Sequence, residues 1–290
     1  MKDLDEWAKA LERLKAEAPK AESGPLPPAA PDSWSWSHVA IDESGASLQA
    51  SRAAPFDRGC ADCFEYGGLV PVPGEPNTLT DCRKCRDLVR RVDMINRAGL
   101  PAKFFGRRFD WSLVSVDGGE NPEGALTGWV DHVARWRNGT GAAPPSLAFF
   151  GATGRGKSHC AFVLAQRAID CGVSVRWIHW SHLKTRIMSK REPQDHVFFG
   201  HFPKRGGVIF VDEFGVGSPN DWACEIACAF LESLPPNCVI VATSNAIPFD
   251  DSANGLVTAV GDRAASRLSG LCGQGDTYLI FSGVDHRRKR

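Results

Sequence analysis

The chain has 290 residues, 43% of them hydrophobic and 23% charged, which is the composition of an ordinary globular protein large enough to bury a core. Its 34 Lys and Arg balance 34 Asp and Glu, so it lacks the basic excess of bulk nucleic-acid binders, although a local basic stripe can suffice. No apolar run reaches the roughly 18 residues of a membrane span, and the charged N-terminus has no signal-peptide core. We therefore expect a cytoplasmic protein without membrane contact, whose ten Cys are reduced.

The first 56 residues contain one predicted helix and a linker. Residues 1–18 place apolar side chains at helical spacing between Asp, Glu and Lys, which predicts an amphipathic helix. Its apolar stripe packs either on the same protein or on a partner, and the sequence leaves both open. Because a Pro-rich stretch follows, we expect 19–56 to be an irregular linker, with 33–56 loop-like.

Four cysteines form a C-x₂-C-x₁₈-C-x₂-C pattern at Cys60, Cys63, Cys82 and Cys85. Four thiolates suit tetrahedral zinc, and the intervening loop is long enough to bring the two pairs together. That loop is rich in turn residues and poor in core residues, so it would need the metal to fold. We expect a structural zinc site, with an iron–sulfur cluster or two redox pairs as the alternatives.

A basic stretch follows the second cysteine pair, and its pattern predicts a helix that ends near Gly99 and Pro101. Its basic side chains could contact phosphates or an acidic protein face, or they could form an ordinary solvated surface. We assign the zinc site and this helix to one module, residues 57–98. The basic residues are Arg83, Lys84, Arg86, Arg90 and Arg91.

From residue 99 to residue 290, short apolar β-rich runs alternate with helical patterns. This alternation predicts an α/β domain in which helices flank a parallel sheet. The apolar runs are 147–151, 173–178, 207–215, 238–245 and 278–283.

The first of these runs leads into a glycine-rich loop, FFGATGRGKSHC, residues 149–160. Gly151, Gly156, Lys157 and Ser158 match G-x-x-x-x-G-K-[ST] between a predicted strand and a predicted helix. Such a loop holds nucleotide phosphates with its amides and its Lys, and the Ser hydroxyl takes a magnesium position. A glycine turn with an accidental Lys is the alternative. The expected nucleotide contacts are Gly151, Ala152, Thr153, Gly154, Arg155, Gly156, Lys157, Ser158 and His159.

Two further strands end in polar residues. Asp212 and Glu213 follow a buried strand, and beside a phosphate loop Asp212 would hold magnesium while Glu213 would polarise the attacking water. The next strand ends in Thr243, Ser244 and Asn245, and we choose Asn245 to position that water near the γ-phosphate. Solvated turns and a turn cap are the alternatives.

Near the end of the chain, Arg263 and Arg267 lie four residues apart and share a helix face. Taken alone they indicate a solvated surface helix. Together, however, the phosphate loop, VDEFG, VATSN and DRAASRL resemble in order and spacing an AAA+ ATPase of the initiator and helicase-loader branch, close to DnaC-type loaders and IstB-type transposition helpers. The resemblance covers residues 99–283.

The resemblance implies an enzyme that hydrolyses ATP to ADP and phosphate with Mg²⁺ at Ser158 and Asp212. It implies catalytic roles for Lys157, Glu213 and Asn245, with Arg267 as a finger in trans and Arg263 as its reserve. The Asp212–Glu213 pair, where such loaders usually carry two Asp, suggests competent hydrolysis. The chain ends soon after 278–283, so we expect no helical lid, as in DnaC-type loaders.

The function expected from this resemblance is that of a helicase loader in a bacterial cytosol, encoded by a cell, phage or plasmid. It would bind a replicative helicase through its N-terminal helix and zinc module, bind single-stranded DNA and assemble into an ATP-dependent oligomer. The alternatives are an IstB-type transposition helper on duplex DNA, and a zinc-dependent adaptor with a slow nucleotide switch. Single-stranded DNA would meet the helix of 181–191, unless that helix is an ordinary solvated face. The DNA-contact residues expected there are Lys184, Arg186, Lys190 and Arg191.

Overall fold

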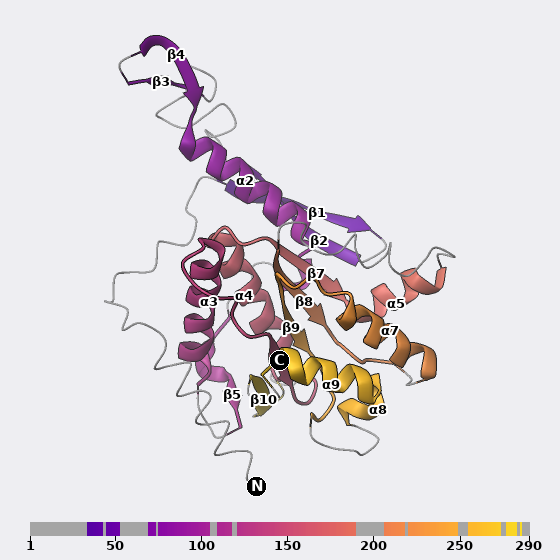
Figure 1. Ribbon diagram of the computed structural model, residues 1–290. Coiled ribbons are helices and arrows are strands. Elements are labelled where there is room, and N and C mark those ends of the chain that lie inside the picture. Colours follow the sequence, from indigo (N-terminus) through magenta and orange to yellow (C-terminus); the bar gives the residue numbers. More distant parts are fainter. Residues whose placement is uncertain are drawn as a thin grey trace. The chain divides into compact units, whose positions relative to one another are not determined.

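The computed structural model divides the chain into two compact units, residues 22–105 and residues 106–290, here named the N-terminal unit and the α/β unit (Figure 1). The expected helix of 1–18 lies outside the residues that the structure describes, as do Cys60, Cys63, Lys190 and Arg191. The described residues are 34–42, 45–52, 69–73, 75–104, 109–117, 121–189, 206–217, 220–248, 255–273, 277–282 and 285.

Within the stretch expected to be loop-like, the structure has an antiparallel hairpin of β1 (Trp34–Asp42) and β2 (Gly45–Arg52). The expectation of an irregular linker is therefore wrong for these residues. The pairing register shifts between Trp36 and His38, as at a β-bulge. In the sequence, apolar residues fall at positions 34 and 36 and then at 39 and 41, so the strand alternation changes phase at this shift. The change of phase hides the period of two that would have revealed the strand.

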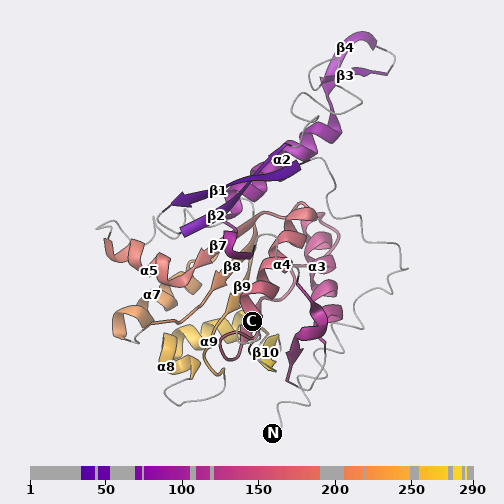
Figure 2. The ribbon, with the colours of Figure 1, turned by 180° about the vertical axis from the view of Figure 1, so that it is seen from behind.

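A second hairpin leads into the basic helix. Strands β3 (Leu69–Val72) and β4 (Glu75–Asp81) pair antiparallel, and α2 (Arg83–Ala98) begins directly after Cys82. Gly99, with φ of 68°, ends α2 in the left-handed conformation that glycine adopts without strain, so the expected helix end is confirmed. Helix α2 runs alongside the β1–β2 hairpin, and a 3₁₀ turn, η2 (Ala102–Phe104), follows it (Figures 1 and 2).

The α/β unit is built on a six-stranded sheet in the order β5-β10-β6-β9-β8-β7, parallel except for the short edge strand β5. This confirms the expected α/β class with a parallel sheet flanked by helices. The strands are β5 (Ser115–Val116), β6 (Leu147–Phe150), β7 (Val175–His179), β8 (Gly207–Asp212), β9 (Cys238–Thr243) and β10 (Tyr278–Ser282).

Helices cover both faces of this sheet (Figure 1). Helices α3 and α4 lie on one side, and α5, α7, α8 and α9 lie on the other. Every residue of β6 and β8 is buried, as expected for parallel strands covered on both faces. The helices are α3 (Glu123–Arg137), α4 (Lys157–Asp170), α5 (Trp180–Ser189), α7 (Asp221–Glu232), α8 (Leu256–Val260) and α9 (Asp262–Leu271), with a 3₁₀ turn η3 (Trp111–Leu113).

The sheet order decides which loops can meet. Strand β9 lies between β6 and β8, and the register aligns Phe149 with Thr243 across β6–β9 and His179 with Asp212 across β7–β8. Because the strands are parallel, their carboxyl ends lie at one edge of the sheet. The phosphate loop and the polar ends of β7, β8 and β9 therefore share that edge. None of the helices in the described part of the chain has the length and apolar character needed to cross a membrane.

Candidate functional site

The predicted phosphate loop lies between β6 and α4 and depends on its glycines. Gly151, Gly154 and Gly156 have φ angles of 125°, 84° and 92°, a region that other residues rarely adopt. A side chain on Gly151 would also overlap the backbone carbonyl of Phe281 in β10. On Gly154 it would overlap the carboxylate of Asp285, so Asp285 also borders the loop. The loop can therefore keep this path only with glycine at these positions.

The side chain of Lys157 joins the loop to the end of β9. Lys157 is 6% exposed, and its ammonium donates hydrogen bonds to the carbonyls of Gly151 and Ala152, at 2.6 and 2.9 Å. It also donates to Oδ1 of Asn245 at 2.9 Å, across 88 residues of sequence. The structure thus brings together Lys157 and Asn245, which the sequence analysis had chosen separately.

Asp212 is held by a residue that the sequence analysis did not choose. The Asp212 carboxylate is fully buried at the end of β8, and Oγ1 of Thr243 donates a 2.7 Å hydrogen bond to its Oδ1. The same Oγ1 accepts a 3.0 Å hydrogen bond from the backbone N–H of Glu213. Thr243 therefore fixes both acidic residues. In the sequence, Thr243 stands at the polar end of the predicted strand, the same end that led to the choice of Asn245.

Glu213 has a strained backbone and a histidine neighbour. It is the one non-glycine residue with positive φ (59°) in the described part of the chain, a conformation that is held only where surrounding contacts demand it. Its Oε2 lies 3.4 Å from Nε2 of His179, the last residue of β7. The other ring nitrogen of His179, Nδ1, lies 2.9 Å from Oγ of Ser181, and the ring stacks on His182 with centroids 4.6 Å apart. The sequence does not indicate a role for His179, because only the sheet order places it beside Glu213.

The segment that enters the α/β unit packs against the first turn of α4. The ring of His159 meets the ring of Phe109 edge to face at 4.8 Å, and Phe109 meets Trp111 at 4.7 Å. A methyl group of Val114 lies 3.8 Å from where a side chain on Gly156 would begin. Residues 109–114 therefore border the loop, a contact that the sequence analysis did not predict.

The remaining predicted loop residues lie at the surface of the same turn. Ala152 and Thr153 are exposed, whereas Arg155 and Ser158 are half-buried. Ser158 follows Lys157 in the first turn of α4.

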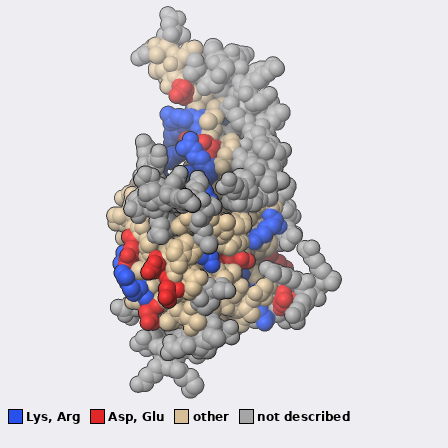
Figure 3. All heavy atoms as spheres, turned by 90° about the vertical axis from the view of Figure 1, so that its right-hand side faces the viewer, with Lys and Arg blue, Asp and Glu red and all other residues tan. Residues whose placement is uncertain are grey.

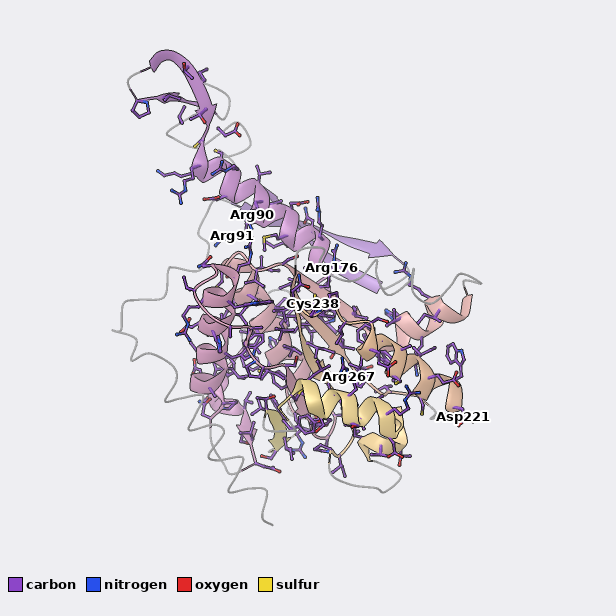
Figure 4. The ribbon with its side chains drawn as sticks, in the orientation of Figure 1. Arg90, Arg91, Arg176, Asp221, Cys238 and Arg267 are labelled. Carbon is purple, nitrogen blue, oxygen red and sulfur yellow. The ribbon has the colours of Figure 1, made fainter. Side chains whose placement is uncertain are left out.

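The two candidate finger arginines differ in their surroundings on α9. Nη2 of Arg263 lies 3.1 Å from Oε1 of Glu232 on α7. Arg267 is exposed, and its side chain makes no hydrogen bond or ion pair with any other described residue (Figure 4). Arg267 is thus the one with its guanidinium available to another molecule.

The described half of the cysteine pattern lies at the junction of β4 and α2. Cys82 and Cys85 are 3% and 5% exposed and pack with Val70. In the register of the hairpin, Leu69 pairs with Asp81, the residue before Cys82. Cys63 lies six residues before Leu69. Within the described residues, no group of three or more potential metal ligands is present.

The predicted DNA-contact residues of α5 take part in packing within the unit. Lys184 donates a 2.6 Å hydrogen bond to the carbonyl of Val216, and partial burial lowers the pKa of its ammonium. Arg186 is half-buried. Helix α5 is thereby tied to the loop that follows Glu213.

Comparisons with known proteins return likenesses in fold. No protein-family model and no curated protein sequence matches the chain. Similar solved structures include DnaI, at 16% identity and a TM-score of 0.42 over 64% of this chain and 94% of that one. The DnaC helicase loader matches at 14% identity and a TM-score of 0.40, over 56% of this chain and 90% of that one. The Orc1 protein of Aeropyrum pernix in complex with DNA matches at 16% identity and a TM-score of 0.40, over 56% of this chain and 45% of that one. The chain thus spans less than half of the Orc1 chain.

Replacing Thr243 by Val keeps the shape of the side chain and removes the hydroxyl shared by Asp212 and Glu213. Because the carboxylate is buried, we expect Thr243→Val to lower the free energy of unfolding by about 1–3 kcal/mol. Thr243→Ser keeps the hydroxyl, so its free energy of unfolding should fall less. The measurement is urea denaturation of the purified proteins. In an Asp212→Asn background the cost of Thr243→Val should shrink, and equal stability of the Val and Ser variants would contradict the role of the hydroxyl.

Proposed function

We propose that this chain is an AAA+-type ATPase of replication initiation that delivers a replicative helicase to single-stranded DNA. The observation that carries the proposal is the network at the sheet edge, in which Lys157 bonds to both the phosphate loop and Asn245. Asp212 and Glu213 are fixed one strand further along by Thr243. These are the side chains that phosphoryl transfer from a nucleoside triphosphate requires, supplied by three adjacent strands.

The loop has the features needed to bind the phosphates of ATP. Its positive-φ glycines and the N-terminus of α4 favour an anion through their amides and the helix dipole. The ammonium of Lys157, held by three neutral oxygens, can exchange these acceptors for phosphate oxygens. Ser158 and Asp212 are the residues that would hold Mg²⁺, and a hydroxyl and a carboxylate are ligands that this cation prefers. Bound there, Mg²⁺ would neutralise charge on the transferring phosphate.

The residues at the ends of β7, β8 and β9 would then act on water. Glu213 would accept the proton of the attacking water, and Asn245 would orient that water. His179 contacts the Glu213 carboxylate 3.4 Å away and so competes for the oxygen that would receive the proton. We assign the finger in trans to Arg267 of a neighbouring copy, because Arg263 is already paired with Glu232 within its own chain.

The loader role is supported by the order of the motifs in the sequence. The phosphate loop, the Asp212–Glu213 turn, the Asn245 turn and the Arg267 helix follow one another as in DnaC-type loaders. The cysteine module and the N-terminal helix provide additional surface for the helicase. We also propose that single-stranded DNA contacts α5. Of the four residues expected to bind it, Lys184 and Arg186 are among the described residues.

Glu213→Gln separates binding from hydrolysis. The amide cannot accept a proton, so we expect kcat for ATP to fall by about 10²–10⁴-fold while nucleotide affinity is kept. Lys157→Ala should abolish tight nucleotide binding. Phosphate release and the binding of a fluorescent ATP analogue measure the two effects. Glu225→Gln, an exposed carboxylate on α7, is the matched control with wild-type kinetics. A wild-type rate in Glu213→Gln would contradict the role of Glu213 toward water, and no hydrolysis by the wild-type chain would leave only the adaptor function.

The loader function predicts a defined complex with the replicative helicase of the host. Mass photometry of the two proteins together should show that complex, and ATP or ADP should strengthen or release it. Lys157→Ala should remove the nucleotide effect, because it removes the phosphate contact. If no complex forms in any nucleotide state, the loader function is wrong. Filaments of the protein on duplex DNA with ATP would then favour the transposition helper.

We also propose that Cys60, Cys63, Cys82 and Cys85 bind one structural zinc ion. The hairpin register pairs Leu69 with Asp81, the residue before Cys82. The six residues from Cys63 to Leu69 can span up to about 20 Å, so Cys63 can reach Cys82. We expect one zinc per chain by inductively coupled plasma mass spectrometry, and none in Cys82→Ser. Cys224→Ser, on α7, should keep its zinc. Iron in place of zinc, with visible absorption, would contradict the assignment.

A further inference from the structure

Helix α2 carries a stripe of arginines opposite its buried face. Arg83, Arg86, Arg90 and Arg97 are three, four and seven residues apart, and at 3.6 residues per turn they fall within an arc of about 60°. Cys85 and the partly or fully buried Val92 and Ile95 lie on the opposite side of the helix. All four arginines are exposed, and Lys and Arg atoms cluster over this helix in the space-filling view (Figure 3).

Three of these arginines are unpaired within the described part of the chain. Nε of Arg97 lies 2.8 Å from Oδ1 of Asp93, so its charge is compensated locally. The side chains of Arg83, Arg86 and Arg90 make no hydrogen bond or ion pair with any described residue. We name these three the arginine stripe.

No acidic side chain in the first turn of α2 offsets the charge of the stripe. The N-terminus of a helix carries a partial positive charge, and acidic residues in the first turn normally offset it. Helix α2 has no acidic residue in its first turn and no side-chain cap, and it begins instead with Arg83 and Lys84. Arg86 and Arg90 also repel each other at a spacing of four residues. The thiolates of the proposed zinc site would offset the charge at the helix start, whereas the repulsion between Arg86 and Arg90 would be left for an anionic partner to relieve.

The spacing of the stripe fits a repeating anion. Along the helix axis, Arg83 and Arg86 are about 4.5 Å apart and Arg86 and Arg90 about 6 Å, whereas phosphates of one DNA strand recur every ~3.4 Å along the duplex axis. Long guanidinium side chains can therefore reach successive phosphates of one strand and bind them in the bidentate manner of Arg. The stripe itself contains no aromatic side chain that could stack on a base, so it provides charge without sequence readout.

We propose that Arg83, Arg86 and Arg90 bind the phosphate backbone of a nucleic acid without reading its sequence. This surface goes beyond the proposed function, which places DNA on α5 and the helicase on the cysteine module. It is also independent of the phosphate loop, because none of the three belongs to the α/β unit.

The test is the salt dependence of binding by the full chain, measured by fluorescence anisotropy with a labelled single strand and a labelled duplex. Each phosphate contact contributes about 0.7 to the slope of log K against log salt on a single strand and about 0.9 on a duplex. The triple variant Arg83→Gln, Arg86→Gln, Arg90→Gln should therefore lose about 2 of the slope on single strands and about 2.7 on duplexes. A slope change of 2 corresponds to about 100-fold weaker binding at 0.1 M salt when the proteins bind equally near 1 M.

The matched control removes the same charge elsewhere, with Lys103→Gln, Arg135→Gln and Arg137→Gln. It should keep the wild-type slope. All of these measurements are made without nucleotide, which separates this proposal from failure of the nucleotide site. Equal slopes for the stripe variant and the wild type overturn the proposal, as does an equal loss in the control. Loss of the helicase complex with unchanged DNA binding would assign the stripe to an acidic protein and also overturn it.

Because two members of the stripe lie next to the cysteines, bound zinc and helix content are measured in each variant. If the triple variant loses either, Arg90→Glu replaces it, since Arg90 lies more than a turn beyond Cys85. That single variant should lose at least about 0.7 of the slope on single strands. An unchanged slope in Arg90→Glu overturns the proposal in the same way.

Discussion

The buried ammonium of Lys157 is the interaction on which the site depends. Lys157 is only 6% exposed, so its charged group needs hydrogen-bond acceptors, and three oxygens within 3 Å provide them. Two of these are loop carbonyls, which point at the ammonium only because the loop follows a path with positive φ at Gly151, Gly154 and Gly156. The third belongs to Asn245, so the same charge holds the turn after β9 against the loop. One cation thereby fixes the relative positions of two segments that are far apart in sequence.

A second set of contacts runs across the sheet edge from β9 to β7. The hydroxyl of Thr243 joins Asp212 to the backbone of Glu213, and the Glu213 carboxylate reaches His179. Ser244 extends the link by donating to the carbonyl of Phe214 at 2.8 Å. The positive φ of Glu213 is held by these neighbours, because an isolated turn would relax to a commoner conformation. The strain therefore lies at the residue that we propose to act on water.

The N-terminal unit is organised differently. Its described part consists of two hairpins and one helix, with Cys82 and Cys85 buried at the start of that helix. The described cluster of Cys82, Cys85 and Val70 is small, and small modules with little core often use a metal. The same helix exposes Arg83, Arg86 and Arg90, whose side chains have no partner among the described residues, so they can meet the external anion that we propose. The face of α2 that carries Cys85 would then contribute to stability, and the opposite face, with the arginine stripe, would bind the anion.

The sequence by itself determined the parts whose chemistry is local. Glycines at fixed spacing with Lys157, carboxylates directly after an apolar strand, and the αL end of α2 at Gly99 depend on residues within a few positions of one another. The β1–β2 hairpin was missed because the apolar alternation changes phase between Trp36 and His38. Thr243, His179 and Phe109 needed the tertiary structure, because their roles arise from neighbours on other strands or helices. Only the order β6-β9-β8-β7 decides which strand ends meet, and that order is set by how the helices pack on the two faces of the sheet.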